Sequence, residues 1–226
     1  MGTKKYRLTG NHINIGSRIL YQIEALKDFG DVKAGDLGGY IESEENLSQY
    51  DNAWVYGDAQ VLGNAQVFDN ARVYGNACVF DNARVYGNAC VFGNAQVFDN
   101  ARVYGNACVF DNARVYGNAC VFDKAEVYGN ALVYDNAQVL GNARVFGDAQ
   151  IKSARDYIVF KNWWSSGRYF TWTRSNNMWK VGCFYGTGEE LIKKAYNDSE
   201  ISGREYERIV RYVEEILEDN YGNKED

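Results

Sequence analysis

The 226-residue chain predicts a mainly β protein in which a parallel β-solenoid separates an N-terminal β cap from a small C-terminal α+β domain. Three observations predict the solenoid. A valine stands at every sixth position from Val55 to Val145, and Ile151 continues the series. An alanine lies two positions before each of these residues, and a pair of turn-forming residues, mostly Gly-Asn or Asp-Asn, separates successive units. The period runs without insertion or deletion, so it indicates stacked units of equal length.

Each six-residue unit reads as one short strand followed by one turn. Alanine and valine alternate with side chains of another character, which is the pattern of a strand with one buried face. Glycine and asparagine tolerate positive φ, so the pair that follows favours a turn. A strand of about four residues buries too little surface to be stable alone, so we expect the units to stack about 4.8 Å apart.

This combination of a buried aliphatic residue with a small residue two positions earlier, repeated every six residues, resembles the hexapeptide-repeat, left-handed parallel β-helix family. The resemblance covers about 100 residues. It implies a triangular coil of three hexads, hence about 5–6 coils, and the left hand of the helix comes from it alone. The segment "DVKAGDLGGYIE" also resembles the start of poorly characterised bacterial and phage hexapeptide-repeat proteins, some of them catalogued as candidate transferases.

The breaks in the hexad pattern divide the chain into three parts. Residues 1–52 are expected to form a β cap with a first irregular coil, 53–154 the solenoid, and 155–226 the α+β domain. Runs "KKYRL", "HINIG" and "RILYQIEAL" indicate strands in the cap. Ile41 and Leu47 are six apart, but Leu47 and Val55 are eight apart, so two extra residues precede the regular register.

The C-terminal part changes composition and predicts a sheet followed by helices. "YIVF", "RYFTWTR" and "MWKVGCFY" indicate three strands of a small antiparallel sheet. Thr187 and Glu190 have the spacing of a capping box before the helix "GEELIKKAY". A second, amphipathic helix is indicated by apolar residues that share one helical face, namely Tyr206, Ile209, Val210, Val213, Ile216 and Leu217.

The residue after each valine is aromatic or leucine, which predicts aromatic columns along the solenoid. With an 18-residue coil, one such column contains Tyr56, Tyr74, Phe92, Phe110, Tyr128 and Phe146. Ring stacking between neighbouring coils is one interpretation. Burial in an interface between copies of the chain, as a trimer or dimer, is the other, because continuous apolar faces rarely stay exposed.

Two stretches of 24 identical residues, 69–92 and 99–122, argue against a specialised site on the regular coils. Both read "DNARVYGNACVFDNARVYGNACVF", and they are offset by 30 positions. Because 30 is not a multiple of 18, the second copy falls on different faces from the first. A site built on one face would not survive such copying, whereas coil stacking would.

The loop expected at "NWWSSGRYF" supplies the candidate contacts for a protein partner. Trp163, Trp164 and Arg168 lie between two predicted strands, and tryptophan and arginine are enriched in protein interfaces. Most other aromatic residues of this part are expected to fill its core.

Charge and composition exclude several ligand classes. The formal net charge is −6 with no basic stripe, so no nucleic-acid partner is expected. No apolar run approaches membrane-spanning length, so the expected location is the cytoplasm, of a host bacterium if the chain is phage-encoded. The five cysteines have no metal-binding spacing and are expected as free thiols. Cys90 and Cys108 should be neighbours on one face, where a structural role is favoured over a regulatory disulfide.

The chemistry of an enzyme is not apparent. Hexapeptide-repeat acyltransferases use a histidine between coils as general base, and the one histidine here, His12, lies in the cap, so that role has no matching position. The pairs Glu44/Glu45 and Glu189/Glu190 fall in expected turns or helix starts, where solvated acids are common. No catalytic residue, metal or cofactor is therefore assigned.

The sequence favours a non-enzymatic scaffold or protein-binding module that self-associates. In a phage setting, which only the resemblance implies, it would bind a host protein such as a defence factor. One alternative is a divergent hexapeptide-repeat acyl or nucleotide-sugar transferase. A second is an oligomer that sequesters a small ligand between its subunits.

Overall fold

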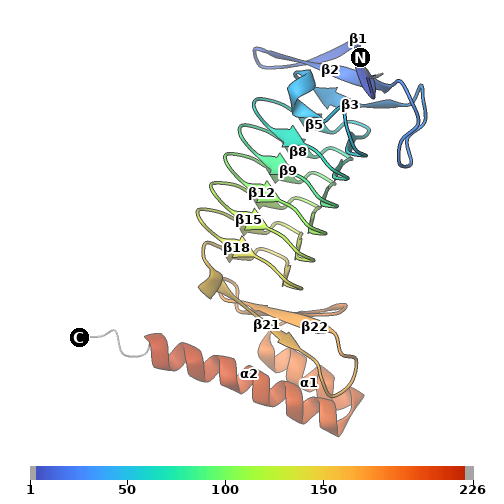
Figure 1. Ribbon diagram of the computed structural model, residues 1–226. Coiled ribbons are helices and arrows are strands. Elements are labelled where there is room, and N and C mark those ends of the chain that lie inside the picture. The colour runs from blue at the N-terminus through green and yellow to red at the C-terminus, as the bar shows by residue number, and fades with distance from the viewer. Residues whose placement is uncertain (1–3, 222–226) are drawn as a thin grey trace.

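The computed structural model describes residues 4–221 and shows a rod of stacked coils between two different ends. Figure 1 places the N-terminal strands β1 (Tyr6–Ile15), β2 (Arg18–Ala25) and β3 (Leu37–Ile41) on one end of the rod. The C-terminal sheet with helices α1 (Gly188–Asp198) and α2 (Glu200–Tyr221) lies on the other end. The repeat region is a parallel β-solenoid, as the hexad pattern predicts.

Seventeen two-residue strands form the three faces of the solenoid. Within each face, residues 18 apart pair in parallel register, as Val91 does with Val109, which confirms three hexads per coil. The first face contains β4 (Trp54–Val55), β7 (Arg72–Val73), β10 (Cys90–Val91), β13 (Cys108–Val109), β16 (Glu126–Val127) and β19 (Arg144–Val145). The second contains β5 (Gln60–Val61), β8 (Cys78–Val79), β11 (Gln96–Val97), β14 (Arg114–Val115), β17 (Leu132–Val133) and β20 (Gln150–Ile151). The third contains β6 (Gln66–Val67), β9 (Arg84–Val85), β12 (Arg102–Val103), β15 (Cys120–Val121) and β18 (Gln138–Val139).

The core of the rod consists of the repeated alanines and valines. Every hexad alanine from Ala53 to Ala149 and every hexad valine from Val55 to Val145 is buried, and so is Ile151. Each hexad directs one small alanine and one larger valine side chain into the core. Every coil therefore adds the same side-chain volume to the core and packs against the next coil in the same way. Hydrophobic burial therefore stabilises stacking at every coil in the same way.

The corners between faces explain the choice of turn residues. The first residue of each turn pair, glycine or aspartate, has a positive φ, for example +70° at Gly87 and +57° at Asp99. Aspartate adds a bond to the next coil, since the Asp99 carboxylate accepts from the Gly117 N–H at 3.0 Å. The asparagines that follow form ladders, as where Asn76 Nδ2 donates to Asn94 Oδ1 at 3.2 Å. The asparagine ladder favours identical residues at equivalent positions of neighbouring coils, because each side chain bonds to its counterpart 18 residues later.

The aromatic columns are stacked within the chain. Phe92 and Phe110 have ring centroids 4.7 Å apart with planes 1° apart, and the same arrangement recurs on the other two faces. The rings are half-buried rather than exposed. The stacking interpretation is thus confirmed, while use of the column Tyr56–Phe146 between copies of the chain remains a prediction.

The N-terminal cap extends one face of the solenoid. It consists of β1 (Tyr6–Ile15), β2 (Arg18–Ala25), β3 (Leu37–Ile41) and the short helix η1 (Glu44–Asn46). The runs predicted as two strands, "KKYRL" and "HINIG", form the single strand β1 with an irregularity between Leu8 and His12. β3 joins β5 in parallel, with Ile41 opposite Val61 and Leu47 opposite Val67. These pairs are 20 positions apart rather than 18, which confirms the two extra residues in the opening coil.

Buried polar groups close the rod at this end. The carbonyl oxygens of Ala53 and Tyr50 accept from Lys5 Nζ at 2.8 and 3.2 Å, and Lys5 is fully buried. Burial lowers the pKa of Lys5 to about 8. The buried Asn46 amide donates to the carbonyls of Gly63 and Ala65, both at 2.9 Å. The cap therefore supplies hydrogen-bond donors to carbonyls of the first coil.

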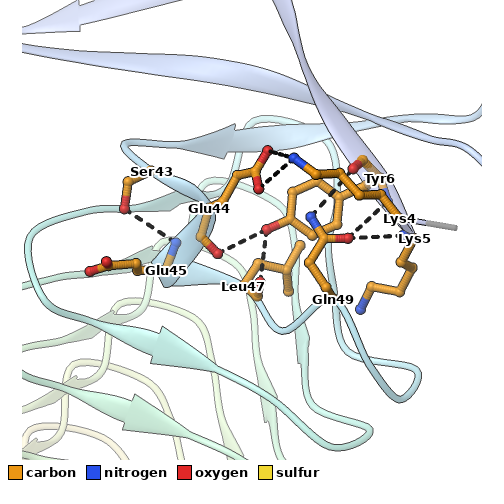
Figure 2. Close-up of polar contacts among 8 residues, drawn as sticks. All are labelled: Lys4, Lys5, Tyr6, Ser43, Glu44, Glu45, Leu47 and Gln49. Carbon is orange, nitrogen blue, oxygen red and sulfur yellow. Dashed lines mark hydrogen bonds and ion pairs between the residues drawn. The ribbon is translucent and has the colours of Figure 1, made fainter. Parts of the chain in front are cut away.

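The residues beside Lys5 fix the start of β1 against the opening coil (Figure 2). The Tyr6 hydroxyl donates toward the carbonyls of Leu47 at 2.7 Å and Glu44 at 3.1 Å, and burial raises the pKa of this phenol. Gln49 Oε1 accepts from the Lys5 N–H at 2.8 Å. Figure 2 also shows the ion pair between Lys4 and the Glu44 carboxylate on the outer side of this cluster.

The C-terminal domain packs two helices against a four-stranded antiparallel sheet. Its elements are η2 (Ala154–Asp156), β21 (Tyr157–Lys161), β22 (Tyr169–Thr173), β23 (Met178–Val181), β24 (Phe184–Gly186), α1 (Gly188–Asp198) and α2 (Glu200–Tyr221). The predicted single strand "MWKVGCFY" is two strands, because Gly182 turns the chain with φ +56°. The capping box of Thr187 and Glu190 is confirmed, and Tyr206, Val210 and Val213 of α2 are buried against the sheet.

Side-chain hydroxyl groups of this domain close the other end of the rod. Thr171 Oγ1 accepts from the Arg144 N–H at 2.8 Å, and Ser175 Oγ accepts from the Gln150 N–H at 2.7 Å. On the third face, the Tyr157 hydroxyl donates to the Gln138 carbonyl at 3.0 Å. Each of the three strand edges therefore has a hydrogen-bond partner from the domain, which covers part of an otherwise unpaired edge.

Candidate protein-binding surface

The loop 162–168 between β21 and β22 is anchored from inside the domain. Its ends meet where the Asn162 N–H donates to the Arg168 carbonyl at 2.8 Å. Asn162 is 4% exposed, and its amide donates to the Tyr206 hydroxyl at 3.0 Å and accepts from the Ser165 N–H at 2.9 Å. A loop with a buried, hydrogen-bonded asparagine at its base has a defined shape.

The two tryptophans of this loop have opposite environments. Trp164 lies against the core, edge-on to Tyr206 at 4.9 Å and to Phe170 at 6.3 Å, and its buried Nε1 has no hydrogen-bond partner among the described residues. Trp163 is 73% exposed. The structure thus separates the three residues predicted to contact a partner: Trp163 and Arg168 are on the surface, and Trp164 anchors the loop. Contact with a partner itself stays a prediction for all three.

Arg168 lines a cleft where the C-terminal domain meets the solenoid. The cleft has a volume of about 350 Å³ and is lined by Lys124, Glu126, Asn142, Arg144, Arg168 and Tyr169. Glu126 is the one carboxylate in this lining and pairs with Arg144 at 3.2 Å, so the lining carries excess positive charge. We call the cleft together with the exposed Trp163 the junction surface.

One hexad on the solenoid side of the junction surface departs from the repeat pattern, at Lys124. Lys124 takes the place that asparagine or aspartate occupies in the other turn pairs, and it ends the asparagine ladder that includes Asn88 and Asn106. Its backbone N–H still donates to the Gly141 carbonyl at 2.9 Å, so the coil is intact. A residue that breaks a repeat without being required by the fold is a candidate for function. That signal was present in the sequence, although the sequence could not show that Arg168 lies across from Lys124.

The predicted oligomer column is closed at both ends by its own chain. At the N-terminal end, the Tyr56 hydroxyl donates to Asp31 at 2.9 Å. At the C-terminal end, Tyr185 packs edge-on against Phe146 at 4.6 Å, and Lys180 Nζ lies 5.0 Å from the same ring. These contacts shorten the apolar strip that another subunit could cover.

A hollow of about 840 Å³ follows a corner of the rod. Its lining includes the ladder in which Asn64 donates to Asn82 at 3.0 Å and Asn82 donates to Asn100 at 3.2 Å. Glu42 at its end accepts from the Gly63 N–H, a bond that lowers the pKa of this carboxyl group, and pairs with Arg18. These groups are bonded to one another, which is consistent with a structural role for this corner.

The histidine and the acidic pairs noted in the sequence are exposed in the structure. His12 is exposed on β1 with Nδ1 3.2 Å from the Gly10 carbonyl. Glu44 and Glu45 begin η1, and Glu189 and Glu190 lie in the first turn of α1, as the sequence indicated. No group of three histidine, cysteine or acidic side chains among residues 4–221 is placed to hold a metal ion. None of the described helices is long and apolar enough to cross a membrane.

The fold and its 18-residue register define the repeat region as a hexapeptide-repeat β-solenoid, which confirms the resemblance seen in the sequence. The YdcK β-solenoid repeat family matches residues 65–80, 83–97, 95–109 and 125–141. All four matches lie within the coils, so they concern the rod and neither of its ends.

A curated relative carries the name "Uncharacterized acetyltransferase YdcK" and comes from Escherichia coli strain K12. It is 43% identical over 51 residues, a segment that covers 23% of this chain and 15% of the relative. The similarity thus extends to a small part of either protein. The acetyltransferase name describes the relative.

Proposed function

We propose that this chain is a non-enzymatic protein-binding module, in which the solenoid is a rigid spacer and the junction surface contacts the partner. The observation that carries the proposal is Trp163, an exposed tryptophan on a loop that Asn162 and Trp164 hold from inside. Exposing a large aromatic ring to water is unfavourable, and ordered aromatic residues with arginine nearby are typical centres of protein interfaces.

The charge of the junction surface specifies the chemistry of the partner. Lys124 and Arg168 add positive charge to the cleft, while Arg144 is neutralised by Glu126. This local charge contrasts with the net charge of −6 of the chain. We therefore expect a protein partner with acidic residues beside an apolar pocket that receives Trp163, and association that weakens as salt increases.

The rod contributes geometry rather than chemistry in this proposal. Its outward positions are copied between coils, and the aromatic columns are satisfied by stacking within the chain. In a phage setting, a host defence protein would be one such partner. Self-association through the column Tyr56–Phe146 is part of the same proposal, and light scattering of the purified chain measures it directly.

The experiment compares partner capture by three baits. Wild type, the double variant Trp163→Ala/Arg168→Glu and the control Tyr212→Ala are immobilised, and bound proteins are identified by mass spectrometry. Tyr212 is 55% exposed on α2, so its removal takes away an exposed ring outside the junction surface. A protein that binds wild type and the control, but not the double variant, supports the proposal. Equal capture by all three baits, or by none, contradicts it.

An acyl-transfer function is the second candidate, and the name of the similar E. coli protein is what favours it. It predicts binding of acetyl-coenzyme A, which would raise the melting temperature in a saturable way. A shift of this kind that persists in the double variant would favour a transferase over a module acting through the junction surface.

A further inference from the structure

Two cysteines lie side by side on the first face of the rod. Cys90 of β10 and Cys108 of β13 are register partners in adjacent parallel strands. Neighbouring strands are about 4.8 Å apart, which is within the Cα separation of disulfides. Both side chains point outward and are partly exposed, and the Cys90 thiol lies 3.9 Å from the Asn88 carbonyl.

The residues next to this pair make its two members chemically different. On one side, Cys90 faces Arg72 of the preceding coil, and on the other, Cys108 faces Glu126 of the following coil. A neighbouring cation stabilises a thiolate and a neighbouring carboxylate opposes it. The charge order along the face therefore favours Cys90 as the thiolate and Cys108 as the protonated thiol.

The direction of the pKa changes agrees with this order. The hydrogen bond from Cys108, opposed by burial and assisted by Arg72, lowers the pKa of Cys90 to about 7. The same hydrogen bond, burial and the charges of Cys90 and Glu126 raise the pKa of Cys108. Burial raises the pKa of Cys78 to about 11 and also raises that of Cys120. Of the four solenoid cysteines, Cys90 thus has a lowered pKa, and Cys78, Cys108 and Cys120 have raised ones.

A cleft of about 350 Å³ gives access to Cys90. It is lined by Asp31, Tyr56, Arg72, Tyr74 and Cys90. Arg72 is shared between the thiol and Asp31, to which it is paired at 3.3 Å. The cleft is large enough for a small polar oxidant and places the arginine beside the sulfur that would react.

We propose that Cys90 and Cys108 form a dithiol site that takes hydrogen peroxide or another small hydroperoxide and closes to a disulfide between two coils. The Cys90 thiolate attacks one peroxide oxygen, so the O–O bond breaks, an S–O bond forms and hydroxide leaves as water after taking a proton. The Cys108 thiol then loses its proton and attacks the Cys90 sulfur, which breaks the S–O bond, forms the S–S bond and releases water. Two thiols lose two electrons and the peroxide is reduced.

The rod supplies matched controls for this proposal. Cys78 faces Gln60 and Gln96 on the second face, and Cys120 faces Arg102 and Gln138 on the third, so neither has a second thiol in register. Glutamine and arginine occupy equivalent outward positions, which shows that serine at these sites is compatible with the coil. Circular dichroism melts verify the fold of each variant.

The test uses the full chain, reduced and then treated with hydrogen peroxide. Wild type is expected to lose two of its five thiols and two hydrogens in mass, reversibly with dithiothreitol, without forming covalent dimers. Cys90→Ser and Cys108→Ser each abolish this disulfide, whereas Cys78→Ser and Cys120→Ser leave it unchanged. Retention of the intramolecular disulfide in Cys90→Ser, or equal oxidation of Cys78 and Cys120, overturns the proposal.

Peptide mapping needs the Cys78→Ser background. Cleavage after arginine gives identical peptides 73–84 and 103–114, both "VYGNACVFDNAR", so Cys78 and Cys108 cannot otherwise be told apart. In this background, the linked peptides are 85–102 and 103–114. Linkage of any other pair contradicts the assignment.

The order of the two steps is tested separately. In Cys108→Ser, dimedone should trap a sulfenic acid on Cys90, while Cys90→Ser should leave Cys108 largely unlabelled. Arg72→Gln should slow disulfide formation by about threefold to tenfold without preventing it, because it removes the cation beside the thiolate. Equal labelling of both cysteines, or an unchanged rate in Arg72→Gln, would refute the assigned roles.

Discussion

The two ends of the rod are closed by opposite chemistry. At the N-terminal end, Lys5 and Asn46 donate hydrogen bonds to backbone carbonyls of the first coil. At the C-terminal end, Thr171 and Ser175 accept hydrogen bonds from backbone N–H groups of the last coil. One end therefore has a buried ammonium group and amide, and the other has neutral hydroxyl groups.

The direction of the ladders explains this difference. In the middle of the rod, the N–H groups of Cys90, Phe92 and Asn94 all donate to carbonyls of the next coil. Three of the six residues in a hexad thus direct their N–H toward the C-terminal end. Carbonyls predominate at the first coil and N–H groups at the last, and each cap supplies what its end lacks. A cap suited to one end would not serve the other.

The largest loss of stability is expected from Asn46→Leu, which removes a hydrogen-bond donor of the N-terminal cap. This change leaves the carbonyls of Gly63 and Ala65 without their donor and removes the acceptor of the Ser43 N–H. Unpartnered buried groups of this kind predict a loss of about 3–5 kcal/mol in the free energy of unfolding, measured with urea. The control Asn82→Ala, in an exposed ladder, should cost less than about 1 kcal/mol. Similar losses in both would show that the N-terminal cap is not specifically required.

A smaller effect is expected at the opposite end from Thr171→Val. The substitution keeps the shape of a buried side chain and removes the acceptor of the Arg144 N–H. We expect a loss of about 1–3 kcal/mol in thermal or urea unfolding. Tyr196→Phe removes an exposed hydroxyl group paired with Glu207 and should change stability little. If Thr171→Val leaves the stability unchanged, water replaces the hydroxyl group at this edge.

The buried charge at the N-terminal end predicts a pH dependence of stability. The pKa of Lys5 falls from an ordinary 10.5 to about 8 in the folded chain, so the folded state loses this proton at lower pH than the unfolded state. Stability should therefore rise as the pH increases from about 7 toward 10, by at most about 1.4 kcal/mol per pH unit. The measurement compares urea unfolding of wild type with that of Lys5→Met across this range. Parallel curves for the two proteins would exclude the effect.

The smallest effect is expected in the middle of the rod, where coils support one another. Asp99 has φ +57° and accepts from the Gly117 N–H. Asp99→Ala should cost about 1–2 kcal/mol, since alanine is unfavourable at positive φ and the bond is lost. Asp99→Gly restores the backbone freedom and should recover part of the loss. If glycine is no better than alanine in urea unfolding, backbone conformation is not what aspartate provides.

The repeats made most of the fold predictable, and the ends far less so. Each hexad valine lies in a local pattern that dictates its neighbours, so burial and register followed from spacing alone. Lys5 and Asn46 carry no such pattern: they look like ordinary polar residues, and their burial depends on carbonyls about 20 or more positions away. Gly182 divides a strand that appeared continuous because its apolar pattern persists on both sides.

The candidate site was predictable only as a loop. The spacing of "NWWSSGR" could not assign Trp163 to solvent and Trp164 to the core, because both choices depend on Tyr206, which lies in a helix about 40 residues later. The cleft could not be predicted from the sequence either, because Lys124 and Arg168 belong to different domains and line the same cleft only in the folded chain. The one local signal was the unusual lysine in its hexad.

The uniform core has a consequence for how the chain reaches its native state. A segment that docks one coil too early or too late presents the same alanines and valines to the axis, so the interior cannot detect the error. Only the terminal segments identify the first and last coil. Refolding should thus produce slipped, long-lived species when either cap is damaged, and a single species when both are intact.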